Sequence, residues 1–206
     1  MSDSMLFWDV DTQADFIYPE GKLYVPGAEM IVPNLKQLTA GAAAHATLIV
    51  SSACAHHPDD PEFTQYPPHC LAGTPGQRKI PETLLSNALT VPNRPVELPQ
   101  NLSRYQQIIL EKQQLDVFSN PNTELLLQRI GRDRRVVLYG VVTEICVAYA
   151  ARGLLHRGYP VSVVTDAIRH LEESKSQIFL EELTRSGATL VATTEVSDSL
   201  ERRPAA

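Results

Sequence analysis

The sequence predicts a three-layer α/β/α fold built on a six-stranded, mostly parallel, Rossmann-like sheet. Short apolar runs rich in β-branched residues alternate with longer segments in which apolar residues recur at helical spacing. The apolar runs are continuous rather than alternating, which is typical of parallel strands covered by helices on both faces. Alternation of strand and helix along the chain therefore favours one sheet between two helical layers.

The first half of the chain supplies three of the expected strands. Residues 5–10 form an apolar run that ends at Asp11, and residues 47–52 form a second run rich in β-branched residues. Residues 29–44 between them have helical periodicity. Residues 107–112 complete the set as a third strand that ends on a charged side chain.

The second half continues the same alternation. Residues 122–131 predict a helix, residues 135–141 a fourth strand, and residues 144–157 a helix that Gly158 ends. The remaining expected elements are a strand at 161–165, a helix at 174–186 and a strand at 189–193. The residues from 201 onward are expected to fray.

Composition limits the possible functions. The chain has 206 residues, of which 43% are hydrophobic and 20% charged, so we expect one globular domain over residues 1–206. Its net charge of −6 and its lack of a basic block argue against a nucleic-acid partner. The apolar runs are too short for a bilayer, the N-terminus resembles no signal peptide, and three irregularly spaced cysteines suggest no disulfide framework. We therefore expect a cytoplasmic protein without membrane contact.

Residues 53–99 interrupt the alternation. They hold nine of the fifteen prolines and several polar clusters. A long stretch of this kind inside a compact domain usually has a functional role. We therefore expect a functional, proline-rich insert within the single domain.

Three chemically versatile side chains follow the predicted strands. Asp11, Lys112 and Cys146 come at or just after the carboxyl ends of strands, where open parallel sheets bind their ligands. A carboxylate near a thiol can take its proton, and an ammonium between them can hold the carboxylate ionised. Each residue also has a plainer interpretation: Asp11 as a turn cap, Lys112 as a solvated strand end, and Cys146 as a core thiol.

The position of Cys146 adds a further expectation. It lies where the fourth strand turns into a helix, at the end where backbone N–H groups are unpaired. The helix dipole there should lower the pKa of the thiol and favour the nucleophilic thiolate.

At this point the chain resembles a known family, the isochorismatase-like cysteine hydrolases, which include nicotinamidases. The resemblance is carried by residues 10–16 (VDTQADF), 110–112 (LEK) and 140–147 (GVVTEICV), and it runs from about residue 5 to residue 195. It implies that Asp11, Lys112 and Cys146 form a catalytic triad. Relatives are commonly homodimers or homotetramers, and the resemblance extends that expectation to this chain.

The same resemblance implies how the backbone around Cys146 serves catalysis. It implies a cis peptide bond between Val141 and Val142, and it assigns the oxyanion hole to the N–H groups of Val142 and Cys146. Such donors would stabilise the negative oxygen formed when the thiolate attacks a carbonyl.

The insert offers a second group of chemically versatile residues. Cys54, His56, Glu62 and His69 supply thiol, imidazole and carboxylate groups, a mixture that suits Zn²⁺ and, less well, Fe or Mn. Solvated loop side chains are the plainer interpretation. The segment is similar to the metal loop of nicotinamidase-like members, except that Cys54 stands where the family usually has aspartate.

These features predict a hydrolase that cleaves the C–N amide bond of a small carboxamide through a thioester on Cys146, with no organic cofactor. The metal would orient a polar group of the substrate, and Phe16, Tyr66 and Phe118 are candidate walls for a planar ring.

Three other functions stay open. A vinyl-ether hydrolase acting on isochorismate would not need the metal loop, and a non-catalytic relative would act as a binding protein. A Rossmann-type nucleotide module would need a glycine-rich first turn, which this chain lacks.

Overall fold

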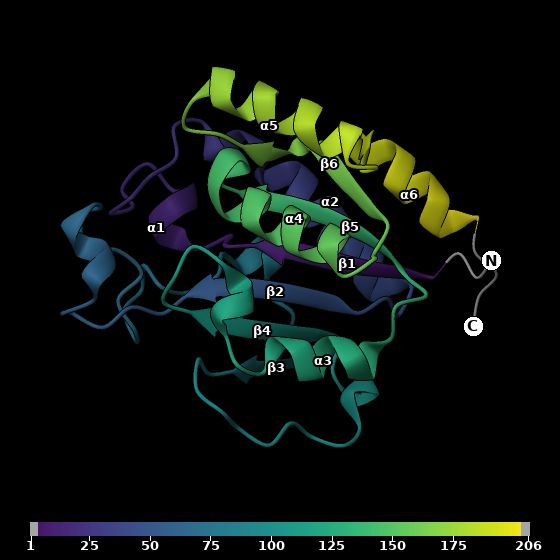
Figure 1. The fold of residues 1–206 in the computed structure, drawn as a ribbon, viewed down its shortest axis with the longest axis horizontal. Helices are drawn as coiled ribbons and strands as arrows, with labels where there is room; N and C mark the ends of the chain where they lie inside the picture. The colour runs from purple at the N-terminus through teal and green to yellow at the C-terminus, as the bar shows by residue number, and fades with distance from the viewer. Residues whose placement is uncertain (1–3, 203–206) are drawn as a thin grey trace.

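The computed structural model describes residues 4–202 as one parallel sheet between two layers of helices (Figure 1). The sheet has seven strands in the order β3-β4-β2-β1-β5-β6-β7. The strands are β1 (Met5–Val10), β2 (Ile49–Cys54), β3 (Ala88–Val91), β4 (Gln107–Lys112), β5 (Arg135–Val141), β6 (Val161–Arg169) and β7 (Thr189–Val191). All six strand pairings are parallel, so the carboxyl ends of the strands meet at one edge.

The helices cover both faces of the sheet. They are α1 (Ala14–Ile17), α2 (Val32–Ala44), α3 (Thr123–Ile130), α4 (Ala148–His156), α5 (Glu173–Arg185) and α6 (Thr193–Glu201). One buried apolar cluster joins the sheet to α3, α4 and α5, and the other joins its opposite face to α1, α2 and α6. Alternate residues of β1 belong to the two clusters: Trp8 packs in the first and Phe7 in the second. This confirms the three-layer α/β/α class.

The predicted number of six strands is wrong, because β3 was missed. This strand has only four residues, lies at the edge of the sheet and is partly exposed. It lies inside the proline-rich insert, directly before Pro92, so it shows no extended apolar run. Helix α6 was also missed, and β6 continues to Arg169 instead of ending at residue 165.

One boundary matters for the site. Strand β2 extends to Cys54 rather than ending at residue 52, because Ala53 and Cys54 pair with Glu111 and Lys112 of β4. Cys54 is therefore held in the sheet, and only the residues after it form the loop. No helix within residues 4–202 has the length and apolar composition needed to cross a membrane.

A buried ion pair anchors the insert to the sheet. The Nζ atom of Lys79 lies 2.6 Å from Oδ2 of Asp9 on β1, and both side chains are almost completely buried. Lys79 also donates to the hydroxyl of Thr12 at 2.8 Å, and Thr12 and Ser51 donate to the Asp9 carboxylate. The carboxylate and the ammonium thus compensate each other away from water.

We expect Lys79→Met to lower the free energy of unfolding by about 3–5 kcal/mol, because it leaves the Asp9 carboxylate buried without a counter-charge. Urea denaturation measures this change. The matched control is Lys175→Met, which removes an equally short but exposed pair with Glu172 and should change stability little. Equal losses in the two variants would contradict the assigned role of the buried pair.

Candidate active site

The candidate active site lies at the carboxyl edge of the sheet, where the strand order changes direction between β1 and β5. Asp11 directly follows β1 and has a φ of 49°, a left-handed conformation that aspartate tolerates better than most residues. Lys112 is the last residue of β4. Cys146 lies in a π-helical turn, Thr143–Val147, which leads from β5 into α4.

The structure brings these three side chains together around the Lys112 ammonium. Its Nζ atom lies 2.9 Å from Oδ2 of Asp11 and 3.6 Å from Sγ of Cys146. The other carboxylate oxygen of Asp11 accepts a hydrogen bond from the hydroxyl of Ser52 at 2.7 Å. Asp11, Lys112 and Cys146 are all buried. A carboxylate, an ammonium and a thiol therefore share one water-poor space.

The turn that carries Cys146 depends on a close approach between strands. Gly140 on β5 has a φ of 117°, and a Cβ atom there would lie 2.1 Å from the carbonyl oxygen of Val10. The Val141–Val142 peptide bond is cis, as the resemblance implied. The Val142 carbonyl accepts hydrogen bonds from the N–H groups of Ile145 and Val147. The oxyanion role of the Val142 and Cys146 N–H groups stays a prediction.

The pKa of Cys146 moves in the direction opposite to our expectation. Burial raises it well above its ordinary value, and the Asp11 carboxylate and Cys54 raise it further against the lowering effect of Lys112. The expectation of a lowered pKa is wrong because it considered only the helix end and neglected burial. A hydrogen bond to Asp11 also raises the pKa of this thiol.

Lys112 remains charged in this site. Burial alone would lower its pKa, but the neighbouring Asp11, Cys146 and Cys54 groups raise the pKa well above its ordinary value. The ammonium thus compensates the buried carboxylate, which is the condition under which such a pair persists.

Cys54, His56 and His69 form a compact cluster beside these residues. One ligand atom from each lies within 4.8 Å of the others, and all three residues are buried. Glu62 Oε1 lies 3.7 Å from Nε2 of His69 and 4.0 Å from Nε2 of His56. The four predicted metal-ligating residues therefore meet, with Glu62 on the histidine side.

The surroundings leave the two histidine Nε2 atoms available for a metal ion. His69 Nδ1 lies 2.9 Å from the Pro67 carbonyl oxygen, so Nδ1 carries the proton. His56 Nδ1 lies 2.9 Å from Asp60, and its buried Nε2 has no hydrogen-bond partner among residues 4–202. Imidazole nitrogens held in this way, with a thiol and a carboxylate, fit Zn²⁺.

Cys54 connects the two groups of residues. Its Sγ atom lies 3.1 Å from Nζ of Lys112 as well as within the cluster with the histidines. Burial raises the pKa of Cys54 to about 12, although Lys112 lowers it. A metal ion at this sulfur must displace the thiol proton, so binding there releases a proton.

The space next to Cys146 is narrow. A cavity of about 30 Å³ is lined by Cys146, by apolar side chains that include Phe16 and Tyr66, and by Cys54, Glu62 and His69 of the cluster. Glu62, Tyr66 and Leu115 also line a cleft of about 960 Å³. Two of the three predicted ring-binding walls, Phe16 and Tyr66, thus line this cavity.

Phe118 does not line the cavity. Its ring stacks on Trp8 at 6.3 Å, lies under the Arg157 guanidinium, and occupies the space that a side chain at position 153 would need. Proximity to β4 in sequence did not reveal that this ring faces the helical layer instead of the pocket.

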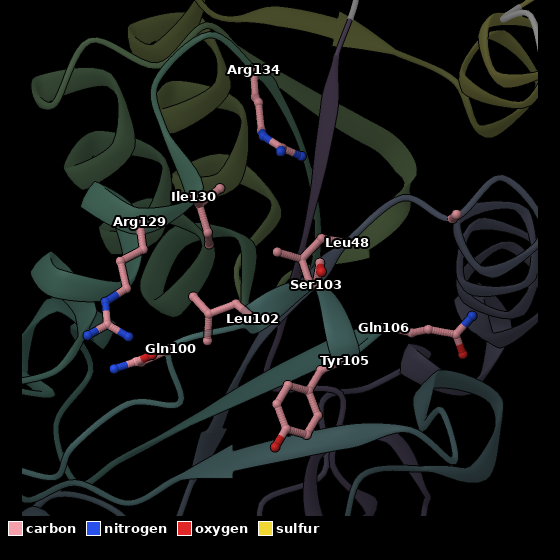
Figure 2. A pocket seen from close by; sticks show the side chains of 10 residues that line it. Leu48, Gln100, Leu102, Ser103, Tyr105, Gln106, Arg129, Ile130 and Arg134 are labelled. Carbon is pink, nitrogen blue, oxygen red and sulfur yellow. The ribbon is translucent and has the colours of Figure 1, made fainter. Parts of the chain in front are cut away.

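A second hollow, of about 580 Å³, lies at the opposite end of the sheet, where β2 and β4 begin (Figure 2). Leu102, Tyr105 and Ile130 supply apolar surface there, and Arg129 donates to the Leu98 and Pro99 carbonyls. The residues lining it include no cysteine, histidine or carboxylate. Chemistry, rather than size, therefore identifies the smaller cavity at Cys146 as the candidate site.

The fold and the site define the class of the protein, a parallel α/β domain with an aspartate, a lysine and a cysteine gathered at the strand ends. A family model of the isochorismatase domain matches residues 6–195. The chain therefore belongs to the isochorismatase family of hydrolases, and its structural neighbours include pyrazinamidases and nicotinamidases.

Three similar proteins illustrate this relationship. The pyrazinamidase of Pyrococcus horikoshii, in complex with zinc, is 25% identical with a TM-score of 0.75, covering 92% of this chain and 99% of that one. A pyrazinamidase/nicotinamidase from Streptococcus mutans UA159 is 25% identical with a TM-score of 0.74, covering 91% and 100%. The probable hydrolase YcaC of Escherichia coli (strain K12) is 27% identical over 125 residues, which span 60% of this chain but only 59% of that protein.

Proposed function

We propose that the protein is an amidohydrolase that cleaves the C–N bond of a small carboxamide through a thioester on Cys146. The observation that carries this proposal is the position of the Lys112 ammonium, 2.9 Å from the Asp11 carboxylate and 3.6 Å from the Cys146 sulfur. The similarity to pyrazinamidases supports an amide rather than a vinyl ether as the reacting group.

The residues divide the chemistry in a consistent way. The Cys146 sulfur attacks the carboxamide carbon while its proton passes to the Asp11 carboxylate. Asp11 then gives this proton to the departing amine, which leaves as ammonia and forms the thioester. A water molecule then attacks the thioester, and Asp11 takes a proton from it and returns it to the leaving sulfur. The Lys112 ammonium, 2.9 Å from Asp11, compensates the charge of the buried carboxylate between these steps.

The narrow cavity supports a small substrate. The small volume beside Cys146 favours a compact reacting group, and the cleft that shares Glu62, Tyr66 and Leu115 with this cavity would take the rest of the molecule. Cys54, His56, Glu62 and His69 would hold the metal ion, which when bound would fix a polar atom of the substrate.

Ammonia release from a panel of small primary carboxamides, including nicotinamide and pyrazinamide, tests the proposal. The expected result is turnover of at least one of them, together with a covalent acyl adduct on Cys146 in acid-quenched samples examined by mass spectrometry. Consumption of isochorismate without ammonia release from any amide would instead support the vinyl-ether alternative.

Metal binding is a separate prediction. We expect the purified protein to bind one zinc ion per chain, and His56→Ala to weaken zinc binding by at least about 100-fold because it removes a direct ligand. Elemental analysis and competition with a chromogenic chelator measure stoichiometry and affinity. His57→Ala is the matched control, since this neighbouring histidine is exposed and lies outside the cluster. A wild-type protein that takes up no zinc, or equal losses in the two variants, would contradict the assignment.

A further inference from the structure

The turn that carries Asp11 is shared by the metal cluster. Strand β1 stops pairing with β2 at Val10, because the left-handed conformation of Asp11 turns the chain away. Strand β2 nevertheless continues to Cys54, which β4 flanks on one side only. The N–H and C=O groups of Cys54 on the β1 side are buried and would lack a neighbouring strand.

The side chain of Gln13 takes the place of that strand. Its Oε1 accepts a hydrogen bond from the Cys54 N–H at 2.7 Å, and its Nε2 donates to the Cys54 carbonyl at 2.8 Å. The same Nε2 donates to the Gln77 carbonyl at 2.6 Å. Gln13 is fully buried. One amide therefore fixes the backbone of Cys54 relative to the turn that carries Asp11.

Asp15, two residues further, holds the other end of the metal loop. Its Oδ2 accepts a hydrogen bond from the N–H of Cys70 at 2.6 Å, directly after His69. Cys70 has a φ of 44°, a left-handed conformation that this contact helps to maintain. A side chain at Gly76 would lie 2.2 Å from the Asp15 carboxylate, so the insert closes tightly over this residue.

We propose that Gln13 and Asp15 are positioning residues that place Cys54 and His69 for metal binding from the same turn that presents Asp11. This inference rests on the metal site of the proposed function. Neither side chain touches the reacting atoms, and their hydrogen bonds act through the backbone of the ligands. One five-residue turn thereby sets the distance between the proton-transferring carboxylate and the metal cluster.

The dissociation constant for zinc, measured with the metal alone by chelator competition, tests this proposal. Gln13→Met keeps the length of the side chain but removes all three hydrogen bonds. Asp15→Asn leaves one acceptor oxygen where the carboxylate accepts from the N–H groups of both Cys70 and Lys22. We expect each to weaken zinc binding by about 10–100-fold, the effect typical of residues that orient metal ligands. If Gln13→Met does not fold, Asp15→Asn carries the test.

A buried amide remote from the cluster provides the control. Asn122 accepts from the Val96 N–H and donates to the Pro92 and Arg94 carbonyls, so Asn122→Leu should lower stability and leave zinc affinity unchanged. Wild-type zinc affinity in Gln13→Met and Asp15→Asn, or an equal loss in Asn122→Leu, would overturn the proposal. Lack of zinc binding by the wild type would also overturn it, whereas ammonia release would then still support the amidase.

Discussion

Cys146→Ala is expected to reduce amide turnover by about 10⁴-fold or more while the protein still folds and binds zinc. The loss is large because Cys146 is the proposed nucleophile, and the other thiol that lines the cavity, Cys54, is held in the cluster with His56 and His69. Ammonia release and acyl-adduct formation both measure the first half-reaction, and this variant should lose both.

Cys70 provides the matched control for this variant. It is also a buried free cysteine near the site, but its sulfur faces the Gly76 carbonyl and does not line the cavity at Cys146. Cys70→Ala should therefore keep most of the turnover. Full ammonia release by the purified Cys146→Ala protein would show that the nucleophile lies elsewhere.

Asp11→Asn should lower kcat by about 10²–10⁴-fold, because the carboxylate both takes the thiol proton and gives one to the leaving amine. The geometry supports this expectation, since Asp11 has the Lys112 ammonium at 2.9 Å and a hydrogen bond with the raised-pKa thiol of Cys146. Steady-state kinetics on the best carboxamide measure the effect. The kcat of the same variant on a methyl ester of the same acid should fall less, because the leaving group of the ester depends less on the proton from Asp11.

Asp9→Asn is a demanding control for Asp11→Asn. Asp9 lies on the same strand and is equally buried, and it also pairs with a lysine, at 2.6 Å from Nζ of Lys79. It should lower stability but change kcat only slightly, because it contacts the insert and not the thiol. Equal kcat losses in the two variants would mean that any buried charge on β1 matters, and that Asp11 has no special chemical role.

The sequence alone located the three chemical groups that follow strands, because the ends of parallel strands have a fixed edge in common. It did not show which way a side chain in a loop or turn points, and Phe118 was misplaced for that reason. It also could not show that burial raises the pKa of the Cys146 thiol despite its position at a helix end. Strand β3 was not predicted because a strand of four residues shows too little periodicity in the sequence.

The supporting contacts were harder to predict than the reactive groups. Gln13 and Asp15 lie within the recognised turn, but their partners Cys54 and Cys70 are 41 and 55 residues away. Asp60 is the exception that a local pattern could have revealed, since it lies four residues after His56 and bonds its ring. Long-range hydrogen bonds between a side chain and a backbone leave no periodic signal.

The small volume of the cavity at Cys146 also has a consequence for larger molecules. A cavity of about 30 Å³ has room for the end of a small molecule, and we expect it to be too small for a peptide bond in a folded chain, which carries bulky substituents on both sides. We therefore expect the proposed hydrolase to leave folded proteins in a mixture uncleaved. Selectivity against macromolecules would then follow from the size of the cavity, independently of any group that recognises the substrate.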